Sequence, residues 1–178
     1  MDVLVAFVGR VRSWRLIWAD APFLYGRGFS WYRYRCAEGA ADLKRSTALL
    51  IQLARRLRAA YPASPKLGLF GFSQGGVMTL SALDQAPALW VAGASLAGYW
   101  LPQRPPQQRL SAISSLPSLL VFHGSGDQRV PLARGERAAQ LFSEAGFPVA
   151  WRGDTRGHEV SAAALAALTD HLRGAWAR

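Results

Sequence analysis

GFSQGG, residues 71–76, lies directly after the apolar run at residues 67–70 and directly before a segment with helical character. A serine at the tip of a sharp turn between a strand and a helix has strained backbone geometry, and bulk two residues before or after it would clash. Both of those positions are glycine. The turn also lies at the positive end of the next helix and directs the backbone amide of Gln74 toward an oxyanion formed at Ser73. The stretch predicts a nucleophile elbow, with an ordinary glycine-rich turn as the alternative.

A serine nucleophile needs a base and a group that orients the base, and in enzymes with a nucleophile elbow these follow in the chain order Ser, acid, His. A strand predicted at residues 118–122 is followed by the loop HGSGDQRVP, which contains Asp127. Another strand, predicted at 148–152, is followed by a loop that delivers His158 just before a helix. Functional groups gather at such strand ends. We therefore expect His158 to be the base and Asp127 to orient it.

Three other residues compete for these roles. His171 lies within a predicted helix, so a surface or half-buried histidine is favoured over a base. His123 ends a strand, and we interpret it as a structural histidine that ties down the acid loop. Asp154 is the rival acid, but it lies four residues from His158 on one short loop and would struggle to reach the far ring nitrogen.

The ordered motifs GFSQGG, HGSGDQRVP and GHEV resemble the phospholipase/carboxylesterase group of α/β hydrolases, which includes acyl-protein thioesterases and bacterial carboxylesterases. ADAP at residues 19–22 and SLAGYWLP at 95–102 are similar to two further family segments. The resemblance implies hydrolysis of small-molecule or lipid esters or thioesters without a cofactor. It also implies roles for single residues: nucleophile Ser73, general base and acid His158, orienting Asp127 and oxyanion-hole amide Gln74.

The beginning of the chain departs from the family pattern. Family members open with a strand ending in a His-Gly loop whose amide is the second oxyanion donor, and here residues 1–12 correspond by position to the family's first helix instead. One oxyanion donor is thus unassigned. Three explanations compete: a recorded start downstream of the true one, a sheet closed around a smaller core, or residues 4–8 acting as a strand. The first is favoured, because a triad without an oxyanion loop is chemically odd; the alternative function is a weak or inactive relative that serves as a binding module.

Strands and helices alternate along the rest of the chain, which predicts a parallel sheet covered on both faces. We expect one α/β-hydrolase domain over residues 1–178, a three-layer sandwich with a mostly parallel sheet, shortened at its N-terminus. The long irregular stretch at 98–116 forms either a rim over the site or a solvated connection. Strands are predicted at 15–19, 66–70, 90–96, 118–123 and 148–152, and helices before residue 12 and at 38–60, 75–85, 132–145 and 160–176.

Composition fits a globular protein, with 51% hydrophobic and 18% charged residues. The single cysteine, Cys36, excludes an internal disulfide and is expected to be a surface thiol. An acid at position 2 argues against a signal peptide, and the apolar runs are too short to span a membrane. We therefore expect a cytoplasmic protein with no integral membrane association. No metal-ligand spacing or phosphate-cradling loop is recognised, so no metal or cofactor is expected.

The formal net charge of +10 invites a nucleic-acid interpretation. The basic residues are scattered, however, and Arg55, Arg56 and Arg58 lie on the outer face of the helix at 38–60, with four leucines predicted to point inward. A solvated face is favoured and no nucleic-acid partner is expected. The basic, aromatic segment at residues 27–35 is a better candidate for contact with an anionic or amphipathic ligand, although packing is favoured there too. The four leucines are Leu49, Leu50, Leu53 and Leu57.

Overall fold

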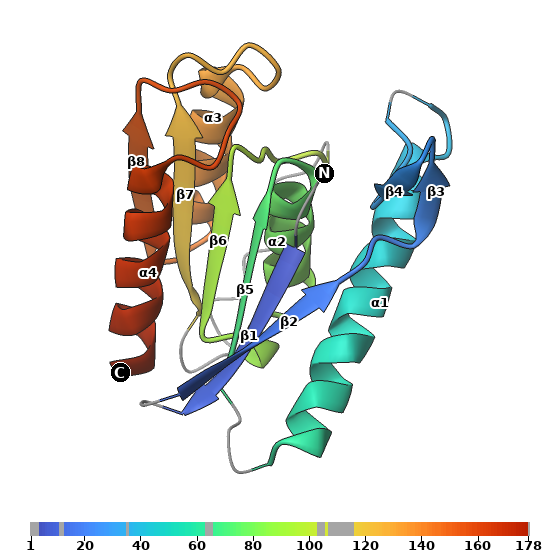
Figure 1. Ribbon diagram of the computed structural model, residues 1–178, viewed down its shortest axis with the longest axis vertical. Helices are drawn as coiled ribbons and strands as arrows, with labels where there is room; N and C mark the ends of the chain where they lie inside the picture. Colours follow the sequence, from blue (N-terminus) through green and yellow to red (C-terminus); the bar gives the residue numbers. More distant parts are fainter. Residues whose placement is uncertain are drawn as a thin grey trace.

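The computed structural model describes residues 4–10, 13–34, 36–62, 66–102, 106 and 116–177. Its main sheet has the strand order β2-β1-β5-β6-β7-β8 (Figure 1). The four strands from β5 to β8 run parallel, whereas β1 is antiparallel to both of its neighbours. The strands are β1 (Leu4–Arg10), β2 (Ser13–Ala19), β5 (Leu67–Phe72), β6 (Ala92–Leu96), β7 (Ser118–Gly124) and β8 (Val149–Asp154).

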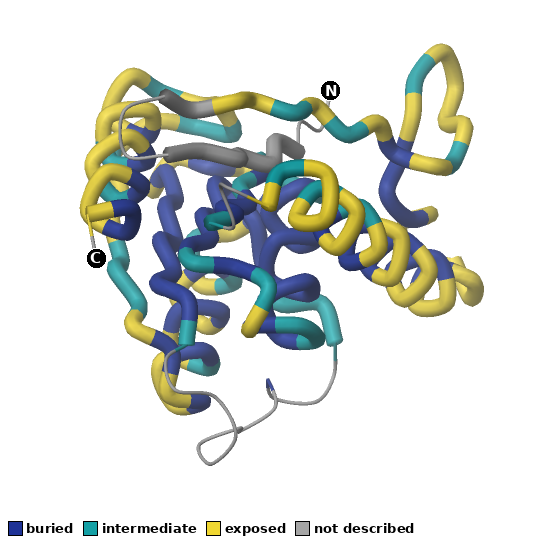
Figure 2. Tube along the Cα trace, turned by 90° about the horizontal axis from the view of Figure 1, so that it is seen from below, coloured by how far each residue is buried: buried dark blue, intermediate teal, exposed yellow. Residues whose placement is uncertain are grey.

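Helices cover both faces of this sheet (Figure 1). Alternate residues of β7 enter different cores: Leu119 and Val121 pack with α1, α2 and α3, while Leu120 and Phe122 pack with α4. Figure 2 shows burial concentrated in the middle of the molecule and exposure along the outer turns of the helices. The predicted three-layer α/β fold is confirmed. The helices are α1 (Gly39–Ala60), α2 (Gln74–Gln85), α3 (Leu132–Glu144) and α4 (Ala162–Ala177), with a short 3-10 turn at Pro87–Leu89.

The expectation of a helix before residue 12 is wrong. Leu4–Arg10 forms β1, which lies between β2 and β5, with Leu4 opposite Gly71 and Val8 opposite Leu67. Here β1 supplies hydrogen-bond partners to two strands that would otherwise expose unpaired backbone groups within the sheet. Of the three explanations for the beginning of the chain, this arrangement matches the one in which residues 4–8 act as a strand.

Helix α1 follows the predicted pattern with one correction. Arg55, Arg56 and Arg58 are exposed, as expected. Leu49 was expected to point inward but is 43% exposed, and Ile51 is buried instead. The helix is rotated relative to the leucine pattern because its buried face also contains small and polar residues, namely Ser46, Thr47 and Ala54.

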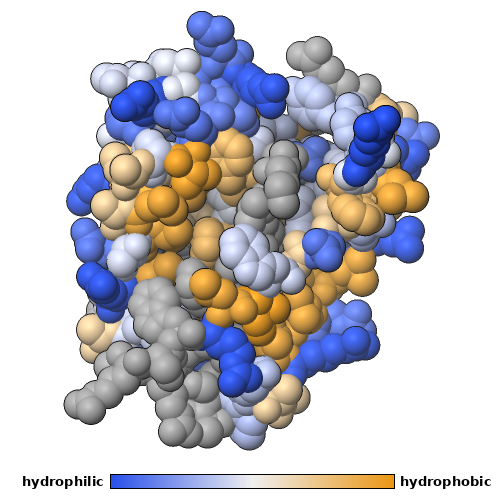
Figure 3. All heavy atoms as spheres, viewed as in Figure 1, coloured by the Kyte–Doolittle hydropathy of each residue, from blue (hydrophilic) through white to orange (hydrophobic). Residues whose placement is uncertain are grey.

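The aromatic segment after residue 21, expected to be a loop, contains a small hairpin. Strands β3 (Phe23–Tyr25) and β4 (Gly28–Ser30) pair with each other in a separate two-stranded sheet. Figure 3 shows hydrophobic residues gathered between hydrophilic ones on the face seen in Figure 1. Most of the stretch at 98–116, for which a rim or a connection was expected, lies outside the described residues.

Candidate active site

The predicted elbow joins β5 to α2. Ser73 has φ 55° and ψ −116°, a conformation that non-glycine residues rarely adopt, and α2 begins at the next residue. The Ser73 amide donates to the Leu96 carbonyl at the end of β6, 2.9 Å away. A Cβ added to Gly71 would lie 2.7 Å from the Gly75 Cα and closer still to the Gly75 carbonyl group. Glycine at position 71 is therefore required by the close approach of strand and helix.

Three residues predicted from separate motifs meet at one edge of the sheet. His158 Nε2 lies 3.0 Å from Ser73 Oγ, and His158 Nδ1 lies 2.7 Å from Asp127 Oδ2. They follow the ends of β5, β7 and β8. Because an ionised carboxylate only accepts hydrogen bonds, Nδ1 carries the proton and Nε2 is left to accept from the serine hydroxyl. The imidazole therefore presents its unprotonated nitrogen to the Ser73 hydroxyl.

The carboxylate of Asp127 is held by its own loop. Its side chain is fully buried, and Oδ1 accepts from the backbone amides of Arg129 at 2.8 Å and Val130 at 2.9 Å. Burial raises the pKa of Asp127, but the hydrogen bonds from His158 and these two amides outweigh it, so the net pKa is lowered. The carboxylate is therefore ionised at neutral pH.

Two neighbouring side chains, His123 and Phe72, restrain the acid loop and the His158 ring. His123 is buried, and its Nε2 donates to the Val130 carbonyl at 2.8 Å, which ties down the acid loop as expected. The Phe72 ring packs against the His158 imidazole, with ring centroids 4.7 Å apart. Packing and hydrogen bonds together limit the rotation of both rings.

The rival residues are engaged elsewhere. Asp154 accepts from the Arg156 amide at 2.9 Å and from Ser161 Oγ at 2.5 Å, which orders the loop that carries His158. His171 is half-buried, and its Nε2 lies 3.3 Å from the carbonyl of Ser118, at the opposite end of β7 from the acid loop.

Gln74 is the first residue of α2, so its backbone N–H has no partner within the helix and can donate outward. Its side chain makes contacts that the sequence did not predict. Oε1 accepts from the Trp31 amide at 3.0 Å, and Nε2 donates to the Tyr32 carbonyl at 3.1 Å. The segment at 27–35 thus adjoins the site, as expected, although Trp31 and Tyr32 are buried by packing.

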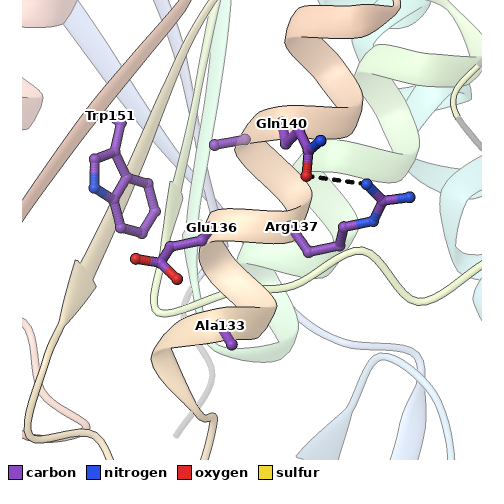
Figure 4. A pocket seen from close by; sticks show the side chains of 6 residues that line it. Ala133, Glu136, Arg137, Gln140 and Trp151 are labelled. Atoms are coloured by element: carbon purple, nitrogen blue, oxygen red, sulfur yellow. Dashed lines mark hydrogen bonds between the residues drawn. The ribbon is translucent and has the colours of Figure 1, made fainter.

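A surface hollow between α3 and β8 lies apart from these residues (Figure 4). Its lining has none of the residues Ser73, Asp127 and His158. The hollow is lined by Ala133, Glu136, Arg137, Ala139, Gln140 and Trp151.

Among the described residues there is no cluster of three or more side chains able to hold a metal ion, and no helix long and apolar enough to cross a membrane. Cys36 is exposed, as predicted for a surface thiol.

Residues 25–175 match the family model for phospholipase/carboxylesterase, so the chain belongs to that family. Among solved structures, a carboxylesterase from Bacillus cereus is 20% identical with a TM-score of 0.76, and the alignment covers 92% of this chain and 76% of that one. Acyl-protein thioesterase 2 from Zea mays is 23% identical with a TM-score of 0.68, covering 84% and 74%. Esterase PE8 is 24% identical with a TM-score of 0.73, covering 87% and 75%. A comparison with curated proteins gives no significant match.

These structural similarities establish the shared α/β-hydrolase fold, and the family match covers the elbow, the acid loop and the histidine loop. Membership in the family supports a serine hydrolase of the esterase or thioesterase type.

Proposed function

We propose that the protein hydrolyses carboxylic esters or thioesters through an acyl-enzyme on Ser73. The observation that carries this proposal is the continuous hydrogen-bonded chain from Ser73 Oγ through His158 to Asp127, at 3.0 and 2.7 Å. Such a chain raises the nucleophilicity of a serine that is otherwise unreactive at neutral pH.

In the first half of the reaction, Ser73 Oγ attacks the carbonyl carbon while His158 Nε2 takes the hydroxyl proton. The carbonyl oxygen becomes an oxyanion, to which the Gln74 backbone N–H donates. When the tetrahedral intermediate collapses, the bond to the alcohol or thiol breaks and His158 gives its proton to that leaving group. The product is an acyl ester of Ser73.

In the second half, His158 takes a proton from a water molecule that attacks the acyl carbon. Collapse of the second intermediate breaks the bond to Ser73 Oγ, which recovers the proton, and the carboxylic acid leaves. Asp127 does not take up a proton in this cycle; it holds the tautomer with Nδ1 protonated and stabilises the imidazolium that forms twice.

A second candidate is a catalytically weak or inactive relative that serves as a binding module. The observation that favours it is the antiparallel direction of β1, because in the family pattern the second oxyanion donor comes from a loop after a strand that ends at the site edge. Loss of one such donor typically lowers turnover by about 100- to 1000-fold.

Covalent labelling with a fluorophosphonate probe separates the two candidates, because the probe needs an activated serine. We expect one adduct, located at Ser73 by peptide mass spectrometry, and none in the Ser73→Ala variant. Folded protein that forms no adduct would refute the enzyme proposal. A series of p-nitrophenyl esters of increasing acyl length then defines the preferred substrate.

A further inference from the structure

Strands β3 and β4 form a hairpin whose large apolar side chains are exposed. Leu24 pairs directly with Phe29, so these two side chains point to the same side of the hairpin. Leu24 is 82% exposed, Phe29 is 58% exposed, and Tyr25, beside the turn, is 69% exposed. These three side chains are here called the hairpin patch. Exposed apolar side chains scattered singly are ordinary, whereas a cluster of them on one small element indicates an interaction site.

The hairpin is attached to the rest of the protein next to the nucleophile. Ser30, the last residue of β4, is buried, and its Oγ lies 3.0 Å from Gln74 Oε1. The Trp31 amide donates to the same oxygen at 3.0 Å. Figure 1 shows β3 and β4 toward the end of the molecule at which β7 and β8 have their carboxyl ends. The hairpin patch and Ser73 therefore lie toward the same end of the molecule.

Cationic side chains lie in the hairpin and beside it. Arg27 is in the turn between β3 and β4 and is exposed. Lys44 and Arg45 of α1 are exposed as well, and the Arg45 guanidinium carbon lies 5.8 Å from the centroid of the Phe23 ring at the beginning of β3. The apolar patch is thus accompanied by positive charge on its own turn and on the neighbouring helix.

The acidic side chains near the hairpin do not cancel this charge. Asp42 of α1 is paired with Arg33, whose Nε lies 2.8 Å from the Asp42 Oδ2. Asp20, before β3, and Glu38, before α1, are the other exposed acids of this region among the described residues. The three cations outnumber these two acids, and the whole chain has a formal net charge of +10. The region therefore complements a negatively charged partner.

We propose that the hairpin patch docks the protein on an anionic lipid surface. Apolar and aromatic side chains enter the boundary between headgroups and acyl chains, and neighbouring cations are attracted to anionic headgroups. A stable protein interface takes roughly 20–30 residues on each side, whereas this hairpin has two strands of three residues and a turn of two. A lipid surface needs no such complementary area. The contact is peripheral, and it brings the end of the molecule that carries Ser73 toward the lipid.

Sedimentation with sucrose-loaded vesicles tests this proposal, with vesicles of phosphatidylcholine alone and of phosphatidylcholine mixed with phosphatidylserine. Wild-type protein should bind the mixed vesicles more tightly. Leu24→Ser should raise the lipid concentration that binds half of the protein about tenfold, because a large apolar side chain no longer leaves water. Leu165→Ser on α4 is the matched control, because Leu165 is 52% exposed and lies outside the hairpin; it should leave binding unchanged.

Arg27→Gln separates the charge from the apolar contact. It should weaken binding to the mixed vesicles about fivefold, which corresponds to the attraction of one cation to an anionic surface. Binding to phosphatidylcholine alone should stay the same. Equal weakening on both kinds of vesicle would contradict the electrostatic part of the proposal.

Equal binding by Leu24→Ser and wild-type protein overturns the proposal, and so does equal weakening by Leu24→Ser and Leu165→Ser, which indicates adsorption without a docking site. Wild-type protein that does not bind the mixed vesicles overturns it too; a dimer in sedimentation equilibrium that Leu24→Ser dissociates would then assign the patch to a second copy of the chain. If Leu24→Ser does not fold, the effect of Arg27→Gln on the mixed vesicles decides. Vesicle binding requires no turnover, so failure of the proposed hydrolysis, measured by fluorophosphonate labelling, is distinguished from failure of this proposal.

Discussion

Gly71→Ala is the substitution whose effect the structure defines most sharply. The added Cβ would lie 2.7 Å from the Gly75 Cα. Carbon atoms in contact prefer about 3.5–4.0 Å, so strand and helix must separate by roughly 1 Å. The obstructing atoms belong to the backbone of the first turn of α2, so no side-chain rotation relieves the clash.

Two effects follow from this displacement. Overpacking of this kind typically costs about 1–3 kcal/mol of unfolding free energy, and a backbone clash belongs at the upper end. The displaced segment also carries Ser73 and Gln74, and a misplacement of about 1 Å at a catalytic group costs on the order of 100-fold in rate. We expect the variant to be destabilised and its labelling by a fluorophosphonate to be slowed about 100-fold.

Urea unfolding and the rate of phosphonylation measure the two effects. Gly174→Ala in α4 is the control, because a Cβ there meets nothing within 4 Å. Alanine is the better helix former, so the control should gain about 0.5–1 kcal/mol and keep the labelling rate. A Gly71→Ala protein with wild-type stability and wild-type labelling would refute the elbow geometry.

Three further predictions concern the acid loop. Asp127→Asn should lower kcat about 10⁴-fold through the wrong imidazole tautomer; ester kinetics with near-normal turnover would contradict this. The folded-state pKa of Asp127 is lowered, so its ionised carboxylate stabilises the folded protein. This contribution to the free energy of unfolding is complete above the ordinary aspartate pKa of about 3.9 and is lost as pH falls through the lowered value. The urea midpoint of unfolding should therefore fall less steeply with decreasing pH for Asp127→Asn than for wild type. Equal slopes of midpoint against pH would contradict the stabilising role of the ionised carboxylate. Gly135→Ala would force a Cβ to 3.0 Å from His123 Cγ and closer to Nδ1, so it should cost about 1–3 kcal/mol and lower kcat by disturbing the acid loop; an unaltered melting temperature and kcat would exclude this role of His123.

Where local signals decide a structure, the sequence predicted it well. The β5-to-α2 turn depends on glycines within four residues, and the loops of Asp127 and His158 each follow a short apolar strand directly. The three side chains could be assigned to one site edge, because parallel strands bring their carboxyl ends together. The sequence could not supply the distances among them.

Non-local contacts decided what the sequence missed. The apolar run that became β1 is short, and periodicity does not distinguish such a strand from a helix; only pairing with β2 and β5 fixes its state. Leu49 was misplaced because the buried face of α1 includes Ser46 and Thr47, which a hydrophobic pattern ignores. The carboxamide of Gln74 bonds residues more than 40 positions away, and no spacing rule connects them.

The direction of β1 limits where a second oxyanion donor can come from. Leu4 pairs with Gly71, near the carboxyl end of β5 and two residues before Ser73, while Val8 pairs with Leu67 at its amino end. β1 therefore ends, at Arg10, at the end of the sheet opposite the nucleophile, so its last residues lie far from an oxyanion at Ser73. In a parallel strand the following loop would lie at the site edge; here that edge meets the beginning of β1. In the proposed reaction, the backbone N–H of Gln74 is therefore the one oxyanion donor assigned among the described residues.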